Sequence, residues 1–77
     1  MFADKVIQYY TLMADNGNAD AQYTLALILL DGKFVESDFA RALAYLEAAT
    51  NQGHEEAKIR YFEETAIDDD GRYDAWV

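Results

Sequence analysis

The stretch ADNGNADAQ, residues 14–22, recurs in altered form as TNQGHEEAK, residues 50–58. Each copy holds a glycine, Gly17 or Gly53, followed four positions later by an alanine, and the two glycines are 36 residues apart. Glycine suits the left-handed conformation that commonly ends a helix, and a polar residue directly after it can cap the next helix. The two stretches therefore predict two helix-turn-helix units.

Apolar residues on both sides of the turns recur at steps of three and four, as in helices, and the chain has no proline. The predicted helices span about residues 2–16, 19–30, 39–52 and 54–66. We expect Asn18 to cap the second helix, and Ser37 or Asp38 to cap the third. The second helix is apolar nearly all round, which predicts that it is the most buried.

A shift of 36 residues superimposes residues of similar size and polarity along both helices of each unit. The matched pairs include Lys5 with Arg41, Ile7 with Leu43, Tyr9 with Tyr45, Met13 with Ala49 and Asp20 with Glu56. The predicted fold class is therefore all-α, with two helix-turn-helix repeats, four helices in total, stacked as a short solenoid over residues 1–66. Residues 67–77 form an acidic and aromatic C-terminal tail that departs from the repeat pattern.

This pattern resembles the Sel-one-like repeat, a relative of the tetratricopeptide repeat. The residues that carry the resemblance are Lys5, Tyr9, Met13, Ala14, Gly17, Ala21, Leu25, Ala26, Gly32, Val35 and Asp38, then Arg41, Ala42, Tyr45, Ala48, Ala49, Gly53 and Ala57. Phe34 stands where the family usually has a connector glycine, and Ala26 where a glycine usually follows the leucine. Tyr61 and Phe62 replace that leucine and glycine in the last helix, which suggests packing against something other than another repeat. The resemblance implies a non-enzymatic adaptor or scaffold.

The repeat pattern also predicts how the helices pack. The alanines at positions 21, 42, 48, 49 and 57 allow helix backbones to approach closely, and Tyr9 and Tyr45 are expected to fill the groove between neighbouring helices. About three or more repeats are usually needed for stability. Two copies therefore predict that the tail caps the array, that the protein forms a homodimer, or that a partner completes it.

The chain is strongly acidic, with 15 acidic and 6 basic residues and a net charge of −9. Such a surface repels nucleic acids and anionic membranes and attracts a cationic protein, although acidity also serves solubility. No apolar run is long enough to span a bilayer, and the N-terminus lacks the features of a secretory signal. The cytoplasm is the simplest location.

Candidate chemistry is sparse. The chain has no cysteine, and its only histidine, His54, is expected to be a solvent-facing turn residue. The run from Asp68 to Gly71 fits a calcium loop poorly, because Ala66 and Val77 occupy the first and last ligand positions. We therefore expect no catalytic, cofactor or metal site, and no enzymatic activity.

Acidic and aromatic residues gather in the last third of the chain, where they form the predicted partner-binding site. They are Glu55, Glu56, Glu63, Glu64, Asp68, Asp69, Asp70, Tyr73, Asp74 and Trp76. Tyr73 and Trp76 either anchor a partner or fold back over Tyr61 and Phe62 as a cap.

Two functions fit these features. The first is a small acidic inhibitor or immunity protein that binds and blocks a basic partner such as a toxin nuclease, an expectation that also rests on the short chain beginning with methionine. The alternative is a generic adaptor that binds a peptide or helix in its groove.

Overall fold

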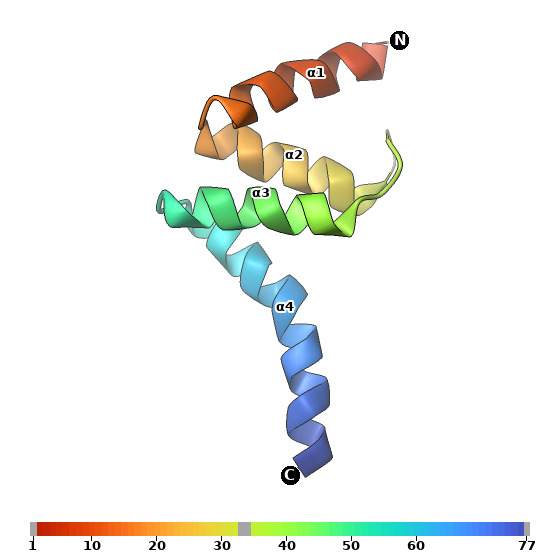
Figure 1. Cartoon of the computed structure of the whole chain (residues 1–77), viewed down its shortest axis with the longest axis vertical. Helices are drawn as coiled ribbons and strands as arrows, with labels where there is room; N and C mark the ends of the chain where they lie inside the picture. Colours follow the sequence, from red (N-terminus) through yellow and green to blue (C-terminus); the bar gives the residue numbers. More distant parts are fainter. Residues whose placement is uncertain (1, 33–34, 77) are drawn as a thin grey trace.

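The protein is all-α, as the sequence predicts. The computed structural model describes residues 2–32 and 35–76, with side chains for residues 4–32 and 35–65. Its helices are α1 (Phe2–Asp15), α2 (Ala19–Asp31), α3 (Phe39–Asn51) and α4 (Glu55–Trp76), and this described part of the chain contains no strand. Helices α1, α2 and α3 run alternately back and forth in a stack, and α4 leaves the stack obliquely (Figure 1).

The two glycine turns have the same geometry, which confirms the repeat. Gly17 and Gly53 have φ values of 96° and 88°, in the left-handed region that favours glycine. Each glycine amide donates to the carbonyl three residues before it, at 3.0 Å and 2.9 Å respectively. Each following amide, of Asn18 or His54, donates to the carbonyl five residues before it, at 3.0 Å and 3.1 Å. Equal hydrogen bonds at a 36-residue offset make the two turns equivalent.

Side-chain caps begin the second and third helices. The Asn18 Oδ1 atom accepts a hydrogen bond from the Ala21 amide at 2.9 Å, as predicted. Of the two candidates for α3, Asp38 is the cap, because its Oδ1 accepts from the Arg41 amide at 3.1 Å. These carboxyl and amide oxygens satisfy amides in the first turn that have no partner within the helix.

Small side chains dominate the core. The buried hydrophobic residues are Ala14, Ala21, Leu25, Ala26, Leu29, Ala42, Leu46, Ala49 and Ala57. Alanine at these contacts lets helix backbones approach closely, as expected from the repeat pattern. Helix α2 contributes the most buried residues and lies between α1 and α3, which confirms its predicted position (Figure 1).

One tyrosine prediction is wrong and the other is confirmed. Tyr45 packs against the core, but Tyr9 is 59% exposed, and its neighbour Tyr10 packs inward instead. Tyr45 lies on the third helix, and its hydroxyl contacts Asp15 at the end of α1. Tyr9 lies on the first helix, and no described element covers it.

Helix α4 is longer than predicted. Its backbone stays helical to Trp76, past the expected end near Ala66. The loss of apolar periodicity suggested an end there, but no proline interrupts the chain and backbone hydrogen bonding can continue through polar residues. The helix crosses the predicted boundary between residues 1–66 and 67–77, and that division stays a prediction. The predicted cap, in which Tyr73 and Trp76 fold over Tyr61 and Phe62, depends on side chains outside those that the structure describes.

Close helix approach at the buried alanines can be tested by substitutions in α3. Ala42 is fully buried, whereas Ala44 on the same helix is exposed. We expect Ala42→Leu to lower the free energy of unfolding by about 1–3 kcal/mol through overpacking, and the matched control Ala44→Leu to change it by less than about 0.5 kcal/mol. Urea denaturation followed by circular dichroism measures both. Equal losses in the two variants would contradict close helix approach at Ala42.

Candidate partner-binding surface

The single histidine lies at the joint between the two repeats. The His54 side chain is only 10% exposed, and its Nδ1 atom accepts a hydrogen bond from the Ala57 amide at 3.1 Å. It thus caps α4 as Asn18 caps α2. Its ring also packs on Tyr23, with centroids 4.8 Å apart. The expectation of a solvent-facing turn residue is wrong, because capping and ring packing hold the imidazole against the repeat.

The other nitrogen of His54 connects α2 to the start of α4. Because Nδ1 accepts from a backbone amide, the proton of the neutral ring belongs on Nε2. Nε2 then donates to the Asp20 Oδ1 atom at 2.9 Å. These residues are 34 positions apart, so local sequence patterns do not indicate the contact. The pair connects the first turn of α2 to the N-terminus of α4.

A buried glutamine joins the two turns as well. Gln22 is 6% exposed, and its Nε2 atom donates to the Ala14 carbonyl at 3.0 Å. Its Oε1 atom accepts from Gln52 Nε2, also at 3.0 Å. Both ends of the buried amide are therefore satisfied, which avoids the cost of an unpaired polar group.

A third contact links α1 to α3. The Tyr45 hydroxyl donates to Asp15 Oδ1 at 3.2 Å, and Arg41 Nη2 donates to the Tyr45 oxygen at 3.4 Å. The hydrogen bond to Tyr45 raises the pKa of Arg41. Together with the His54 and Gln22 contacts, this link sets the orientation of the last repeat.

The predicted partner-binding carboxylates on the first part of α4 divide into two groups. Glu55, Glu56 and Glu63 are exposed, and the first two lie in the first turn, where the helix dipole favours negative charge. Glu64 instead accepts a hydrogen bond from Arg60 Nε at 2.9 Å, and its side chain is only 21% exposed. Three carboxylates are thus open to a partner, and Glu64 is engaged within the helix.

Two exposed apolar residues lie among these carboxylates. Ile59 and Phe62 are 56% and 54% exposed. Ala57 and Tyr61 pack against the core on the opposite side of α4. Residues four, seven and eight positions apart share a helix face, so one side of α4 carries a mixed acidic and apolar surface. We call this surface the α4 outer face; it consists of Glu55, Ile59, Phe62 and Glu63.

The sequence prediction included neither apolar residue as a binding residue. Ile59 did not stand out because an isolated isoleucine in a helix usually packs inward. The remaining predicted site residues belong to the later part of α4, and their side chains lie outside those that the structure describes. They are Asp68, Asp69, Asp70, Tyr73, Asp74 and Trp76.

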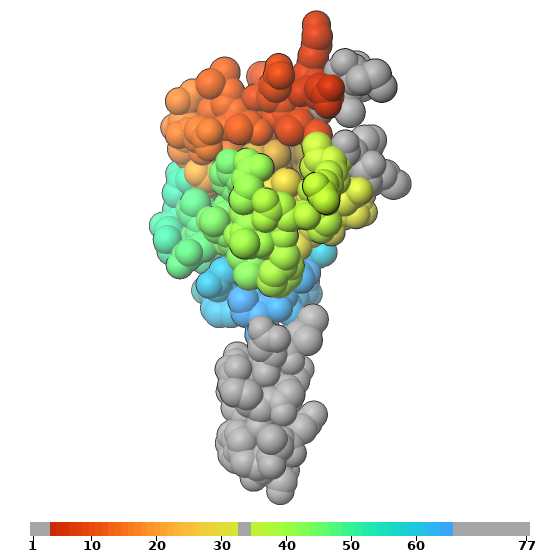
Figure 2. Space-filling model, turned by 45° about the vertical axis from the view of Figure 1, so that its right-hand side comes forward, coloured from red at the N-terminus to blue at the C-terminus, as the bar shows by residue number. Residues whose placement is uncertain are grey.

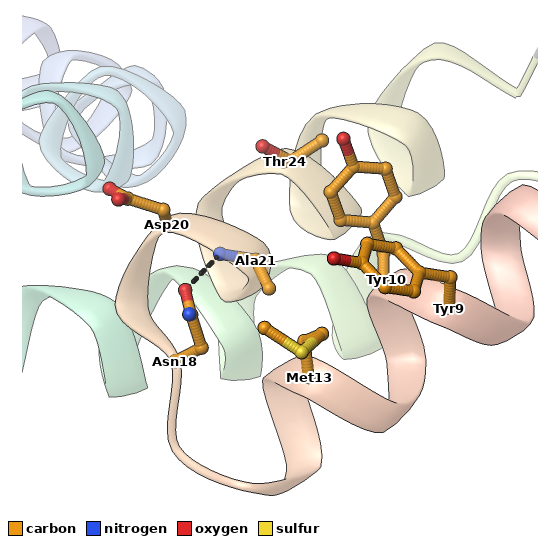
Figure 3. Close-up of a pocket in the computed structure, with 7 residues that line it drawn as sticks. All are labelled: Tyr9, Tyr10, Met13, Asn18, Asp20, Ala21 and Thr24. Atoms are coloured by element: carbon orange, nitrogen blue, oxygen red, sulfur yellow. Dashed lines mark hydrogen bonds between the residues drawn. The ribbon is translucent and has the colours of Figure 1, made fainter.

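A groove between α1 and α2 is a second candidate (Figure 3). It has a volume of about 270 Å³ and is lined by Tyr9, Tyr10, Met13, Asn18, Asp20, Ala21 and Thr24. The Tyr9 and Tyr10 rings meet edge to face, with centroids 5.5 Å apart. Figure 3 shows the Asp20 carboxylate turned away from these rings. The groove therefore presents an aromatic surface without a carboxylate aimed into it.

Figure 2 shows the first part of α4, in blue, at the end of the body formed by the other helices. A further hollow of about 480 Å³, lined by Leu27, Leu30, Asp31 and Arg60, lies between α2 and α4. Arg60 there is already paired with Glu64, so the hollow offers no unengaged cation.

Two kinds of site are absent from the described residues. Within them, no group of three or more His, Asp or Glu side chains is arranged to hold a metal ion. None of the helices in this part of the chain combines the length and apolar character needed to cross a membrane.

A family model described as Sel1 repeat matches residues 7–18 and 19–54. The chain belongs to the Sel1 repeat family. The longer match covers α2, α3 and the turn that ends at His54, and leaves α4 outside. Sel1 repeats generally mediate protein–protein interactions and are non-enzymatic. Comparison with curated proteins found no match, and comparison with solved structures found none.

The cap of α4 in this Sel1 repeat protein generates a second stability test. Asparagine caps the equivalent helix of the first repeat, so His54→Asn keeps a capping acceptor, whereas His54→Ala removes it. We expect His54→Ala to have a free energy of unfolding about 0.5–2 kcal/mol below that of His54→Asn. Denaturation curves at neutral pH measure the difference. Identical curves would show that Nδ1 does not cap the helix.

Proposed function

We propose that this Sel1 repeat protein binds a basic protein partner through the acidic surface of α4. The observation that carries the proposal is the exposure of Glu55, Glu56 and Glu63 around Ile59 and Phe62. Rigid apolar groups surrounded by charge are typical of interface anchors, because the apolar groups are buried while the charges steer the encounter.

The charge balance of the helix supports a cationic partner. The chain carries a net charge of −9, and among the α4 residues whose side chains are described, 55–65, the opposing bases are Lys58 and Arg60. Arg60 is paired with Glu64, which leaves three exposed carboxylates against the single base Lys58. Such an excess attracts basic proteins and repels nucleic acid phosphates.

A narrower form of this proposal is an inhibitor or immunity protein that covers the basic active site of a toxin nuclease. An acidic surface suits that role because it occupies the place of nucleic acid phosphates. The alternative is an adaptor that binds a peptide in the α1–α2 groove, where Tyr9, Tyr10 and Met13 provide apolar contacts. The two differ in salt dependence, since only the acidic surface relies on charge.

Charge reversal on α4 tests the proposal. We expect Glu55→Lys with Glu63→Lys to reduce capture of the basic partner from an extract of the source cell by about tenfold or more. The matched control is Glu36→Lys with Glu47→Lys, which makes the same charge change at exposed positions outside α4. Mass spectrometry identifies the captured protein, and circular dichroism confirms that both variants are folded.

The salt dependence of binding provides a second test of the proposal. Capture through α4 should weaken steeply as salt rises. Equal loss in both charge-reversal variants would indicate a general charge effect and contradict a site on α4. Salt-insensitive capture that is lost with Tyr9→Ala would favour the α1–α2 groove.

A further inference from the structure

The α4 outer face is equivalent to a surface that lies buried within the repeat array. The 36-residue shift places Ile59 on Tyr23 and Phe62 on Ala26. In α2 these positions are covered, because Ala26 is 0% exposed and Tyr23 packs against the core. In α4 the same positions are more than half exposed, and no described element packs over them. The face is therefore one half of a helix–helix interface.

The occupant of this face differs from another repeat of the same kind. Helices α2 and α3 pack against each other, and Ala26 of α2 and Ala42 of α3 are both 0% exposed in the core that they share. Phe62 replaces the first of these alanines in α4, and its ring occupies the space that a closely packed backbone would need. An incoming helix must present a small residue opposite Phe62 or pack at a greater distance.

The charges on the face indicate the chemistry of the occupant. Glu55 and Glu63 correspond to Ala19 and Leu27 in the first repeat, so α4 carries two carboxylates where α2 has apolar residues. A partner on this face must bring cationic groups to these positions, since carboxylates left unpaired at an interface are costly. A second copy of this chain fits poorly, because each copy has a net charge of −9.

We propose that an amphipathic helix of a basic protein docks along the α4 outer face, in the place that α3 occupies on α2. Its apolar stripe packs against Ile59 and Phe62, with a small residue opposite Phe62. Its Lys or Arg side chains flank that stripe and pair with Glu55 and Glu63. The inference rests on the proposed function and specifies the form of the partner. The described side chains of α4 cover about three helical turns, enough for two anchoring contacts.

Two synthetic peptides of identical composition serve as probes. One places leucine and alanine at helical spacing with lysine on both flanks, and the other has the same residues in scrambled order. In a titration of the ¹⁵N-labelled protein, we expect the amphipathic peptide to shift the amide signals of Ile59, Phe62 and Glu63. We expect it to bind about tenfold more tightly than the scrambled peptide.

A pair of matched double variants tests the apolar anchors. Ile59→Ser with Phe62→Ser removes both from α4, and Leu12→Ser with Phe39→Ser removes two similarly exposed residues from α1 and α3. We expect the first pair to weaken peptide binding by about tenfold or more and the second to leave it unchanged. All four residues are at least half exposed, so folding should survive, which circular dichroism checks.

Three results would overturn the inference. They are equal binding of the scrambled peptide, signal shifts confined to the α1–α2 groove, and a dimer in sedimentation that dissociates with Phe62→Ser. Failure here is distinguishable from failure of the proposed function. If capture of the basic partner depends on Glu55 and Glu63 but is unaffected by the Ile59 and Phe62 variant, the proposed function stands and helix docking is wrong.

Discussion

The structure depends on close approach of helix backbones, which buried alanines permit. Ala26, Ala42, Ala49 and Ala57 are fully buried, and each lies where neighbouring helices contact one another. A methyl group fills little volume, so the helices can pack closely with few large side chains between them. Each helix packs on the next one along the chain, and the outer sides of α1 and α4 stay uncovered (Figure 1).

Contacts between alanines do not by themselves fix the angle between two packed helices. Polar contacts at the turns fix it. Gln22 connects the Ala14 carbonyl to Gln52, and His54 connects α4 to Asp20. Hydrogen bonds are directional, so these side chains allow fewer orientations than apolar packing does. The joint therefore determines how α4 leaves the stack and which of its sides is open. The architecture and the proposed binding surface depend on the same residues.

Features controlled by residues near in sequence were predicted well. The glycine turns, the caps at Asn18 and Asp38 and the buried alanines all follow local rules of spacing and conformation. Predictions failed where a distant neighbour decides the environment. His54 is shielded because Tyr23 and Asp20 lie beside it, and Tyr9 is exposed because no described element covers its side of the first helix. The later carboxylates of the predicted site stay predictions.

The repeat, its fold class and the acidity of its last helix were readable from residue order alone, because helical spacing, turn chemistry and charge are properties of the chain. The tertiary structure decided which side of α4 is open. Ile59 and Phe62 resemble core residues in the sequence, and only the position of α3 against Ala57 and Tyr61 turns them outward. A side chain's exposure depends on what packs beside its helix, and that is settled by contacts between segments distant in sequence.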